Sequence, residues 1–248
     1  MVEPILAKAQ ETSNLSCNQC SLGNVCLPIA VSHENLYRLE AVVNQGKVFD
    51  KGELIFRQSD PFKSCFAVQG GAIKTYFVSE DGEKQVTGFY LPGEVIALDS
   101  VNTDHYSCSA EALERSSLCE IPLNRLEELA TRIPSLQQHF FQLMSREIRN
   151  SHQMSMLLNR KTAEERLASF LLSISTRFYR RRLSPAHFRL PMARSDIANF
   201  LGLAVETVSR VLTRFQKQEL VYFQGRNCTL VNIDGLRDIV NKYNPPNE

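Results

Sequence analysis

The sequence predicts an α+β chain in three parts: an N-terminal antiparallel β-roll of the cupin-like jelly-roll type, one long helix, and a C-terminal winged helix-turn-helix. Three observations predict it. Residues 46–121 hold short β-rich runs separated by glycines, which is the pattern of an antiparallel sandwich or barrel. Neither proline nor glycine occurs between Pro134 and Pro185, so this stretch can form long helices. Residues 194–216 have the spacing of two helices joined by a glycine turn.

Composition and charge set the broad class of the chain. Its 248 residues are 43% hydrophobic and 22% charged, as in soluble globular proteins. No apolar run is long enough to span a bilayer and no secretory signal is visible, so we expect a cytoplasmic protein without a membrane partner. Residues 1–159 carry 13 Lys and Arg against 19 Asp and Glu, whereas residues 160–248 carry 15 against 8. The basic C-terminal third indicates a nucleic-acid-binding part attached to a mildly acidic body.

Three cysteines near the N-terminus, Cys17, Cys20 and Cys26, follow the pattern Cys-x2-Cys-x5-Cys. The polar residues around them indicate a loop, in which Gly23 would let the chain turn back and bring the third thiol to the other two. A fourth thiolate would complete a metal site, and the candidates are Cys65, Cys108, Cys119 and Cys228. Four thiolates suit either structural zinc or an iron–sulfur cluster. The single Cys-x2-Cys pair favours the cluster, with zinc and unligated thiols as the alternatives.

The β-rich region contains the loop 79–84, SEDGEK, which predicts a hairpin with Gly82 at positive φ. Cys119 lies in the last β-rich run, SSLCEIP, directly before a short helix predicted at 122–131.

Residues 134–160 are predicted to form a helix about 40 Å long at 1.5 Å per residue. One stripe along it, in steps of three and four, could pair with a second copy of the chain to give a homodimer. The candidate interface residues on this stripe are Phe141, Met144, Ile148, Ser151, Ser155 and Leu158. The stripe is apolar at one end and polar at the other, so a weak coiled coil and a helix that covers its own domain are both open. A second amphipathic helix is expected after Arg160.

Residues 194–216 carry the signature of a helix-turn-helix. Ala198 is small where the two helices would cross, Gly202 permits a left-handed turn, and Val208 and Val211 would bury the second helix. The start of that helix would present four polar side chains to a DNA major groove: Glu206, Thr207, Ser209 and Arg210. Arginine can pair with guanine and a carboxylate can accept from cytosine. An ordinary helical hairpin is the alternative. Two β-rich runs around Gly225 predict the wing.

The segments CNQCSLGNVC and VETVSR, together with the β-roll and the long helix, resemble the CRP/FNR family of bacterial transcription regulators, and within it the oxygen-responsive branch. The resemblance covers the whole chain. It implies a cysteine-rich cluster-binding segment at 1–30, a β-roll sensory domain at 31–133, a dimerisation helix at 134–160, and a winged helix-turn-helix DNA-binding domain at 161–248.

The resemblance also implies a mechanism. A [4Fe–4S] cluster would be ligated by Cys17, Cys20, Cys26 and Cys119, and the remaining cysteines would be buried, inert thiols. With the cluster intact, a homodimer would bind double-stranded DNA at a palindromic operator, where Glu206, Ser209 and Arg210 would read bases. Oxygen would degrade the cluster, loosen the dimer and release the DNA. A surface loop such as 79–84 would meet RNA polymerase.

Some residues depart from the family pattern. The cyclic-nucleotide branch needs an arginine after its Gly-Glu pair, but after Gly93 and Glu94 no basic residue occurs until Arg115, so we expect no cyclic nucleotide. Ala193 and Ala204 stand where helix N-cap hydroxyls are expected. A zinc-stabilised CRP-like regulator that responds to another small ligand is the alternative function. We do not expect an enzyme, because the five histidines form no cluster in the sequence.

Overall fold

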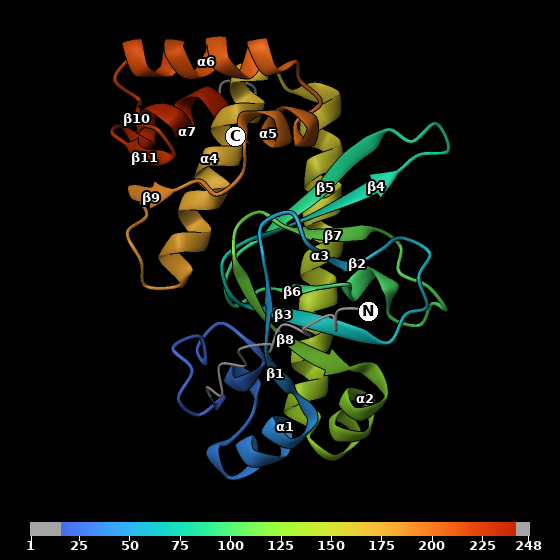
Figure 1. Cartoon of the computed structure of the whole chain (residues 1–248). Helices are drawn as coiled ribbons and strands as arrows, with labels where there is room; N and C mark the ends of the chain where they lie inside the picture. Colours follow the sequence, from blue (N-terminus) through green and yellow to red (C-terminus); the bar gives the residue numbers. More distant parts are fainter. Residues whose placement is uncertain (1–15, 242–248) are drawn as a thin grey trace, which may run out of the picture. The chain divides into compact units, whose positions relative to one another are not determined.

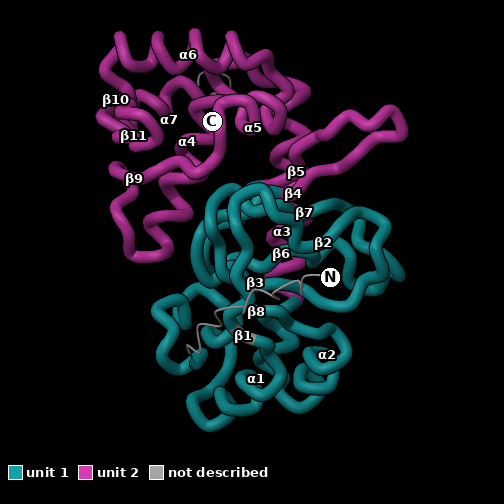
Figure 2. Tube along the Cα trace, in the orientation of Figure 1, with its two compact units in different colours: residues 1–74, 89–140 teal, residues 75–88, 141–248 magenta. Residues whose placement is uncertain are grey.

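The structure, a computed structural model, describes residues 16–241 (Figure 1). Residues 1–15 of the predicted cysteine-rich segment lie outside the described residues. The chain divides into two compact units (Figure 2). Among the described residues, the first unit comprises residues 16–74 and 89–140, and the second comprises residues 75–88 and 141–241.

The predicted β-roll is confirmed as two four-stranded sheets. The first has the order β1-β8-β3-β6, with β1 (Asn44–Phe49), β8 (Ser116–Pro122), β3 (Ser64–Gly70) and β6 (Val95–Ile96). The second has the order β2-β7-β4-β5, with β2 (Leu54–Phe56), β7 (Ser109–Ala112), β4 (Ile73–Val78) and β5 (Lys84–Tyr90). β8 pairs antiparallel with both β1 and β3, and β2 pairs antiparallel with β7.

Aromatic rings fill the core of the roll. The ring of Phe56 stacks on Tyr106 with centroids 4.1 Å apart and on Phe66 with centroids 5.8 Å apart. The Tyr106 hydroxyl donates to the Ser64 carbonyl at 3.0 Å, which satisfies the polar end of this buried ring. Aliphatic side chains complete the cluster, among them Val68, Ile73, Ile96 and Leu118.

Helical segments flank the roll in the first unit. Two 3-10 turns, Leu27–Ala30 and His33–Asn35, lead into α1 (Leu36–Val42), and a third turn spans Leu98–Ser100. The predicted short helix after the roll is α2 (Leu123–Arg132). The hairpin between β4 and β5 turns at residues 79–84 with Gly82 at φ +80°, as predicted.

The long helix α3 (Pro134–Arg160) begins at the predicted proline and has 27 residues. Leu136 is its one buried residue, whereas the side chains of Phe141 and Ile148 are 57% and 58% exposed. The part of α3 in the second unit therefore presents apolar side chains that this chain leaves uncovered.

The second unit contains the predicted winged helix-turn-helix. Its elements are α4 (Ala163–Arg180), β9 (His187–Arg189), α5 (Arg194–Phe200), α6 (Val205–Lys217), β10 (Val221–Gln224), β11 (Asn227–Leu230) and α7 (Ile233–Asn241). The strands form one sheet in the order β10-β11-β9, which confirms the wing. Within residues 16–241, we find no helix with the length and apolar character needed to cross a membrane.

Asn199 of α5 attaches the β4–β5 hairpin to the helix-turn-helix. The Asn199 Oδ1 accepts from the backbone N–H of Val86 at 2.6 Å, and its Nδ2 donates to the Lys84 carbonyl at 2.7 Å. The Gln85 side chain donates to the Asn199 carbonyl at 2.8 Å. β5 is the last strand of its sheet, so this amide occupies an edge that would otherwise present unpaired backbone groups.

Candidate functional site

A mostly apolar cavity in the first unit brings together four of the cysteines. Its empty volume is about 470 Å³ when the open solvent at its mouth is included, and Cys17, Cys20, Cys26 and Cys119 line it. The apolar part of the wall includes Leu27, Leu39, Val43, Val68 and Ile121. The structure thus places around one space the three cysteines that the spacing singled out and Cys119, which the family resemblance implied. None of the seven cysteines forms a disulfide among residues 16–241.

The three N-terminal cysteines lie on consecutive turns. The backbone N–H of Cys20 donates to the Cys17 carbonyl at 3.4 Å, and that of Gly23 donates to the Cys20 carbonyl at 3.1 Å. The N–H of Cys26 donates to the Leu22 carbonyl at 2.9 Å. Gly23 does not adopt positive φ, and a Cβ there would make an ordinary 3.5 Å contact. The turn therefore does not depend on glycine, unlike our expectation from the sequence.

Cys119 reaches the cavity from the middle of the first sheet. It lies on β8 opposite Ala67 of β3, and both residues line the cavity. Because β8 is held on both sides by neighbouring strands, the position of this thiol is fixed by the roll itself.

Burial and mutual repulsion disfavour the charged form of these thiols. Burial is the largest cause that raises the pKa of Cys26 to about 12, and the charges of Cys119, Cys17 and Cys20 raise it further. Burial likewise raises the pKa of Cys119, with a contribution from Cys20. A cationic group in the cavity would remove both penalties, because thiolates are the ligating form. Within residues 16–241, no three His, Cys, Asp or Glu side chains converge as ligands of a single metal ion.

Two contacts that the sequence did not reveal hold the cysteine segment in place. The Glu40 carboxylate on α1 accepts from the backbone N–H of Asn18 at 3.0 Å and from the Ser16 hydroxyl. The Ser16 hydroxyl is the largest cause that lowers the pKa of Glu40. Val25 packs on Gly93, where a Cβ would lie 2.6 Å from Val25 Cγ2, and Gly93 has φ +89°. An isolated glutamate and a loop glycine carry no sequence signal for such long-range contacts.

The remaining cysteines are buried away from this cavity. Burial is the largest cause that raises the pKa of Cys65 and of Cys228 to about 12. Cys108 is also buried. These three thiols fit the expected role of inert core residues.

The helix-turn-helix has the packing that the sequence predicted. Gly202 has φ +60° in the turn between α5 and α6, and Ala198 is buried where the helices meet. Val208 and Val211 bury the inner face of α6. Both helices lack a side-chain N-cap at Ala193 and Ala204, as expected. For α5, the Asp196 carboxylate compensates by accepting from the backbone N–H of Ala193 at 3.2 Å.

The four candidate base-reading residues lie at the start of α6. Glu206 and Arg210 are exposed, while Thr207 and Ser209 are half-buried. Arg210 Nη2 donates to the Thr207 hydroxyl at 3.2 Å, which orients the guanidinium along the helix. Thr207 thus supports Arg210 as well as lying beside it. Arg214, one turn further along, forms an ion pair with Glu164 of α4, a contact that sequence spacing did not reveal.

The candidate dimer residues on α3 differ in exposure. Phe141, Ile148, Ser151 and Ser155 are exposed. Met144 and Leu158 are half-buried. The predicted stripe is thus available to a partner along most of its length.

Comparison with known proteins matches the β-roll and the helix-turn-helix to two separate families. Residues 46–132 match the family described as the cyclic nucleotide-binding domain, and residues 165–239 match the Crp-like helix-turn-helix domain. The chain is 46% identical to the transcriptional activator protein FnrA of Stutzerimonas stutzeri, over 95% of this chain and 96% of that one. It is 40% identical to the fumarate and nitrate reduction regulatory protein of Escherichia coli K12, over 91% of this chain and 90% of that one.

A solved structure is similar over most of the chain. FixK2 from Bradyrhizobium japonicum has a TM-score of 0.73 and 31% sequence identity, over 80% of this chain and 97% of that one. The match to the cyclic nucleotide-binding family covers the β-roll, and the absence of a bound nucleotide stays a prediction. The identity over nearly the whole length shows that this chain belongs to the CRP/FNR family of DNA-binding transcription regulators, which are not enzymes.

Proposed function

We propose that this protein is an oxygen-sensing global transcription regulator whose Cys17, Cys20, Cys26 and Cys119 hold a [4Fe–4S] cluster. The observation that carries the proposal is that these four thiols line one cavity, although Cys119 is far from the others in the sequence. The name of the E. coli relative, a fumarate and nitrate reduction regulatory protein, fits a regulator of this kind.

The donor set fits the cluster. Four cysteine thiolates are the usual ligands of a [4Fe–4S] cube, which holds them around a volume rather than about a point. The apolar wall lies against the thiols, and a cationic core bound there would offset the burial and mutual repulsion that raise the pKa of Cys26. Bound there, the cluster would supply the oxygen-labile chemistry of the sensor.

The chain can carry a change at the cavity to α3 through β8. Cys119 lies on β8, which leads through α2 directly into α3. The other three thiols lie on the turns that Glu40 and Gly93 hold. Ligation of all four thiols would order the cysteine segment against β8, the strand that leads to α3. Loss of that link in air would release the segment and weaken the dimer.

We further propose that the homodimer forms along residues 134–160 and binds a palindromic operator. The exposed Phe141 and Ile148 supply apolar area for the contact, and the exposed Ser151 and Ser155 keep it weak enough to be switched. In this scheme the functional parts are the cluster-binding segment 1–30, the sensory roll 31–133, the dimerisation helix and the DNA-binding domain 161–248. Such a regulator would work in the cytoplasm.

Glu206, Ser209 and Arg210 would read bases, with Thr207 holding the arginine in place. The hairpin loop 79–84 is exposed and is our candidate contact with RNA polymerase. Asp81→Ala in this loop should lower transcription activation in a purified system while operator binding stays unchanged, and equal loss of both would contradict this role.

The central test is an anaerobic visible spectrum with iron and sulfide counted per chain. We expect a brown protein with about four irons and four sulfides that bleaches in air, together with loss of the dimer in sedimentation. A colourless protein with one zinc per chain would establish the zinc-stabilised alternative instead.

Single cysteine variants locate the ligands. Cys17→Ser, Cys20→Ser, Cys26→Ser and Cys119→Ser should each abolish the anaerobic chromophore. Cys108→Ser is the matched control, because this thiol is buried outside the cavity, and it should keep the chromophore. A Cys119→Ser protein with the full wild-type spectrum would refute the assignment of the fourth ligand.

A further inference from the structure

One arginine of α4 contacts the backbone at two helix ends that are distant in the sequence. Arg166 Nη2 donates to the Leu158 carbonyl at 2.7 Å, and its Nε donates to the Lys161 carbonyl at 2.9 Å. Its Nη1 donates to the Leu201 carbonyl at 3.0 Å and lies 3.4 Å from the Gly202 carbonyl oxygen. A single guanidinium therefore joins the end of α3 to the turn of the helix-turn-helix.

These carbonyls need a partner because of where they lie. α3 ends at Arg160, and Leu158 carries one of its last carbonyls, which have no donor within the helix. The carbonyls of Lys161, Leu201 and Gly202 come directly after the ends of α3 and α5, outside the helical hydrogen bonds. The C-terminal end of a helix also carries a partial negative charge, which favours a nearby cation. Arg166 is half-buried and satisfies both requirements at two helix ends at once.

The neighbouring contacts bring the same elements together. The two atoms nearest to a Cβ built on Gly202 would be Arg166 Nη1 at 3.6 Å and Leu158 Cδ2 at 3.7 Å. The turn thus lies directly against the end of α3.

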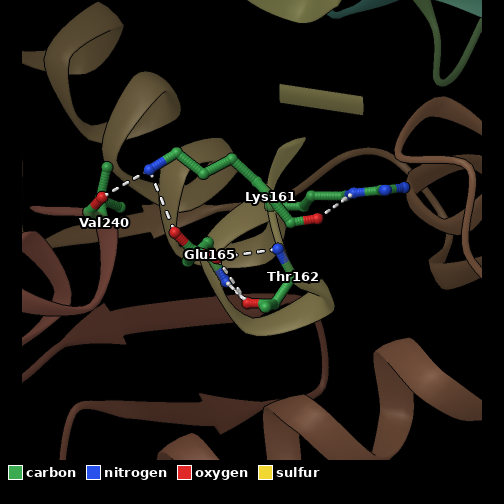
Figure 3. A network of polar contacts seen from close by, with 5 residues as sticks. Lys161, Thr162, Glu165 and Val240 are labelled. Atoms are coloured by element: carbon green, nitrogen blue, oxygen red, sulfur yellow. Dashed lines mark hydrogen bonds and ion pairs between the residues drawn. The ribbon is translucent and has the colours of Figure 1, made fainter. Parts of the chain in front are cut away.

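On the same junction, Lys161 donates to the Val240 carbonyl of α7 at 2.8 Å and pairs with Glu165 at 3.0 Å (Figure 3). Thr162 and Glu165 form a capping box there that starts α4. The junction between α3 and α4 is therefore attached to both α5 and α7.

We propose that Arg166 is a positioning residue that fixes the orientation of α6, the recognition helix of the helix-turn-helix, relative to α3. This inference rests on the proposed dimer, in which two copies of α3 would set the distance between the two recognition helices. The orientation of each helix-turn-helix on α3 then sets the half-site spacing that the protein accepts. Lysine cannot replace Arg166, because an ammonium lacks the planar fork that reaches both helix ends.

The test compares operators of different spacing. The probes are a palindrome selected by the wild-type protein from random duplexes, the same palindrome with one base pair added between the half-sites, and a single half-site. We expect Arg166→Lys and Arg166→Gln to bind the selected palindrome about tenfold to a hundredfold more weakly. Spacing discrimination, the ratio of the affinities for the selected and the lengthened palindrome, should fall by a similar factor. Half-site affinity and its salt dependence should stay at the wild-type values, because the base-reading residues remain in place.

Arg237→Lys is the matched control, since Arg237 lies in the same domain in an exposed pair with Asp234. It should leave both affinity and discrimination unchanged. Wild-type spacing discrimination in the Arg166 variants would overturn the proposal. So would an equal loss on all three probes, because that pattern indicates general destabilisation.

A second measurement does not depend on the dimer. In the monomeric apoprotein, amide hydrogen exchange at residues 201–204 should become about tenfold faster in Arg166→Lys, because the turn loses its tether to α3. Unchanged exchange would overturn the role of Arg166. A third outcome is that the wild-type protein binds both palindromes equally while amide exchange in Arg166→Lys becomes faster as expected. That result would contradict the proposed dimer but would support the attachment of the turn to α3 by Arg166.

Discussion

The two long helices α3 and α4 follow one another in the sequence but differ in how much of each is buried within this chain. α4 has 18 residues and buries seven of them within its own domain. α3 has 27 residues, of which Leu136 alone is buried. α4 also begins with a full capping box at Thr162 and Glu165. The comparison teaches that α4 belongs to a finished core, whereas the apolar side chains of α3 find little burial in a single chain.

The largest expected effect separates the cores of the two helices. Leu171→Ala on α4 removes a side chain that is 1% exposed, and it should lower the free energy of unfolding of the DNA-binding domain by about 2–5 kcal/mol. Ile148→Ala on α3, where the side chain is exposed, is the control and should change monomer stability by less than about 0.5 kcal/mol. Urea unfolding at low protein concentration checks both. Equal losses would show that α3 is as much a core helix as α4.

A smaller effect is expected where α3 is deliberately polar. Ser151→Leu adds an apolar side chain to the exposed stripe, and its burial in a dimer should contribute about 1–2 kcal/mol per chain. A tenfold change in an equilibrium needs only about 1.4 kcal/mol, so this variant should dimerise and bind DNA in air. Sedimentation in air tests the prediction. A monomeric variant would mean that position 151 lies outside the contact.

The start of α4 offers a change of about 1 kcal/mol. Thr162→Ala removes the hydroxyl that accepts from the backbone N–H of Glu165 and should destabilise the DNA-binding domain by about that amount. Thr162→Ser keeps the hydroxyl and should restore most of the stability. Thermal unfolding of the two variants measures the difference. Equal melting temperatures would mean that the Thr162 hydroxyl does not stabilise α4.

The smallest effect is a dependence on pH. Burial alone would raise the pKa of Glu165, but hydrogen bonds from Thr162 and the ion pair with Lys161 outweigh it and hold the pKa below its usual range. A group whose pKa is lowered in the folded protein stabilises the fold at pH values above its unfolded pKa. That stabilisation is lost as the pH falls from the unfolded pKa, about 4.3, through the folded pKa. Glu165→Gln should therefore flatten the acid limb of the stability curve. If the acid limb stays as steep as in the wild-type protein, the loss of stability in acid comes from other carboxylates.

Local pattern was enough to predict much of this molecule. Glycine-separated β runs gave the roll, the absence of proline and glycine gave α3, and Gly202 with Ala198 gave the helix-turn-helix. For the candidate site, spacing singled out Cys17, Cys20 and Cys26, and the resemblance to a family was needed to choose Cys119.

The contacts that no pattern predicted are polar and join distant parts of the chain. Glu40 with Asn18, and Arg166 with Leu201, each pair a side chain with a backbone group many residues away. Such bonds follow from where the folded backbone leaves a free donor or acceptor, which has no period in the sequence. They could be found only after the elements had been placed.

The amide of Asn199 has a chemical consequence for the edge of β5. Its oxygen and nitrogen imitate a peptide group, one accepting from Val86 and the other donating to Lys84. Deamidation to aspartate would exchange that donor for a second oxygen facing the Lys84 carbonyl, and two acceptors repel each other. One slow hydrolytic event, without any change of shape or size, would thus unfasten the hairpin and uncover a strand edge on which another chain can assemble.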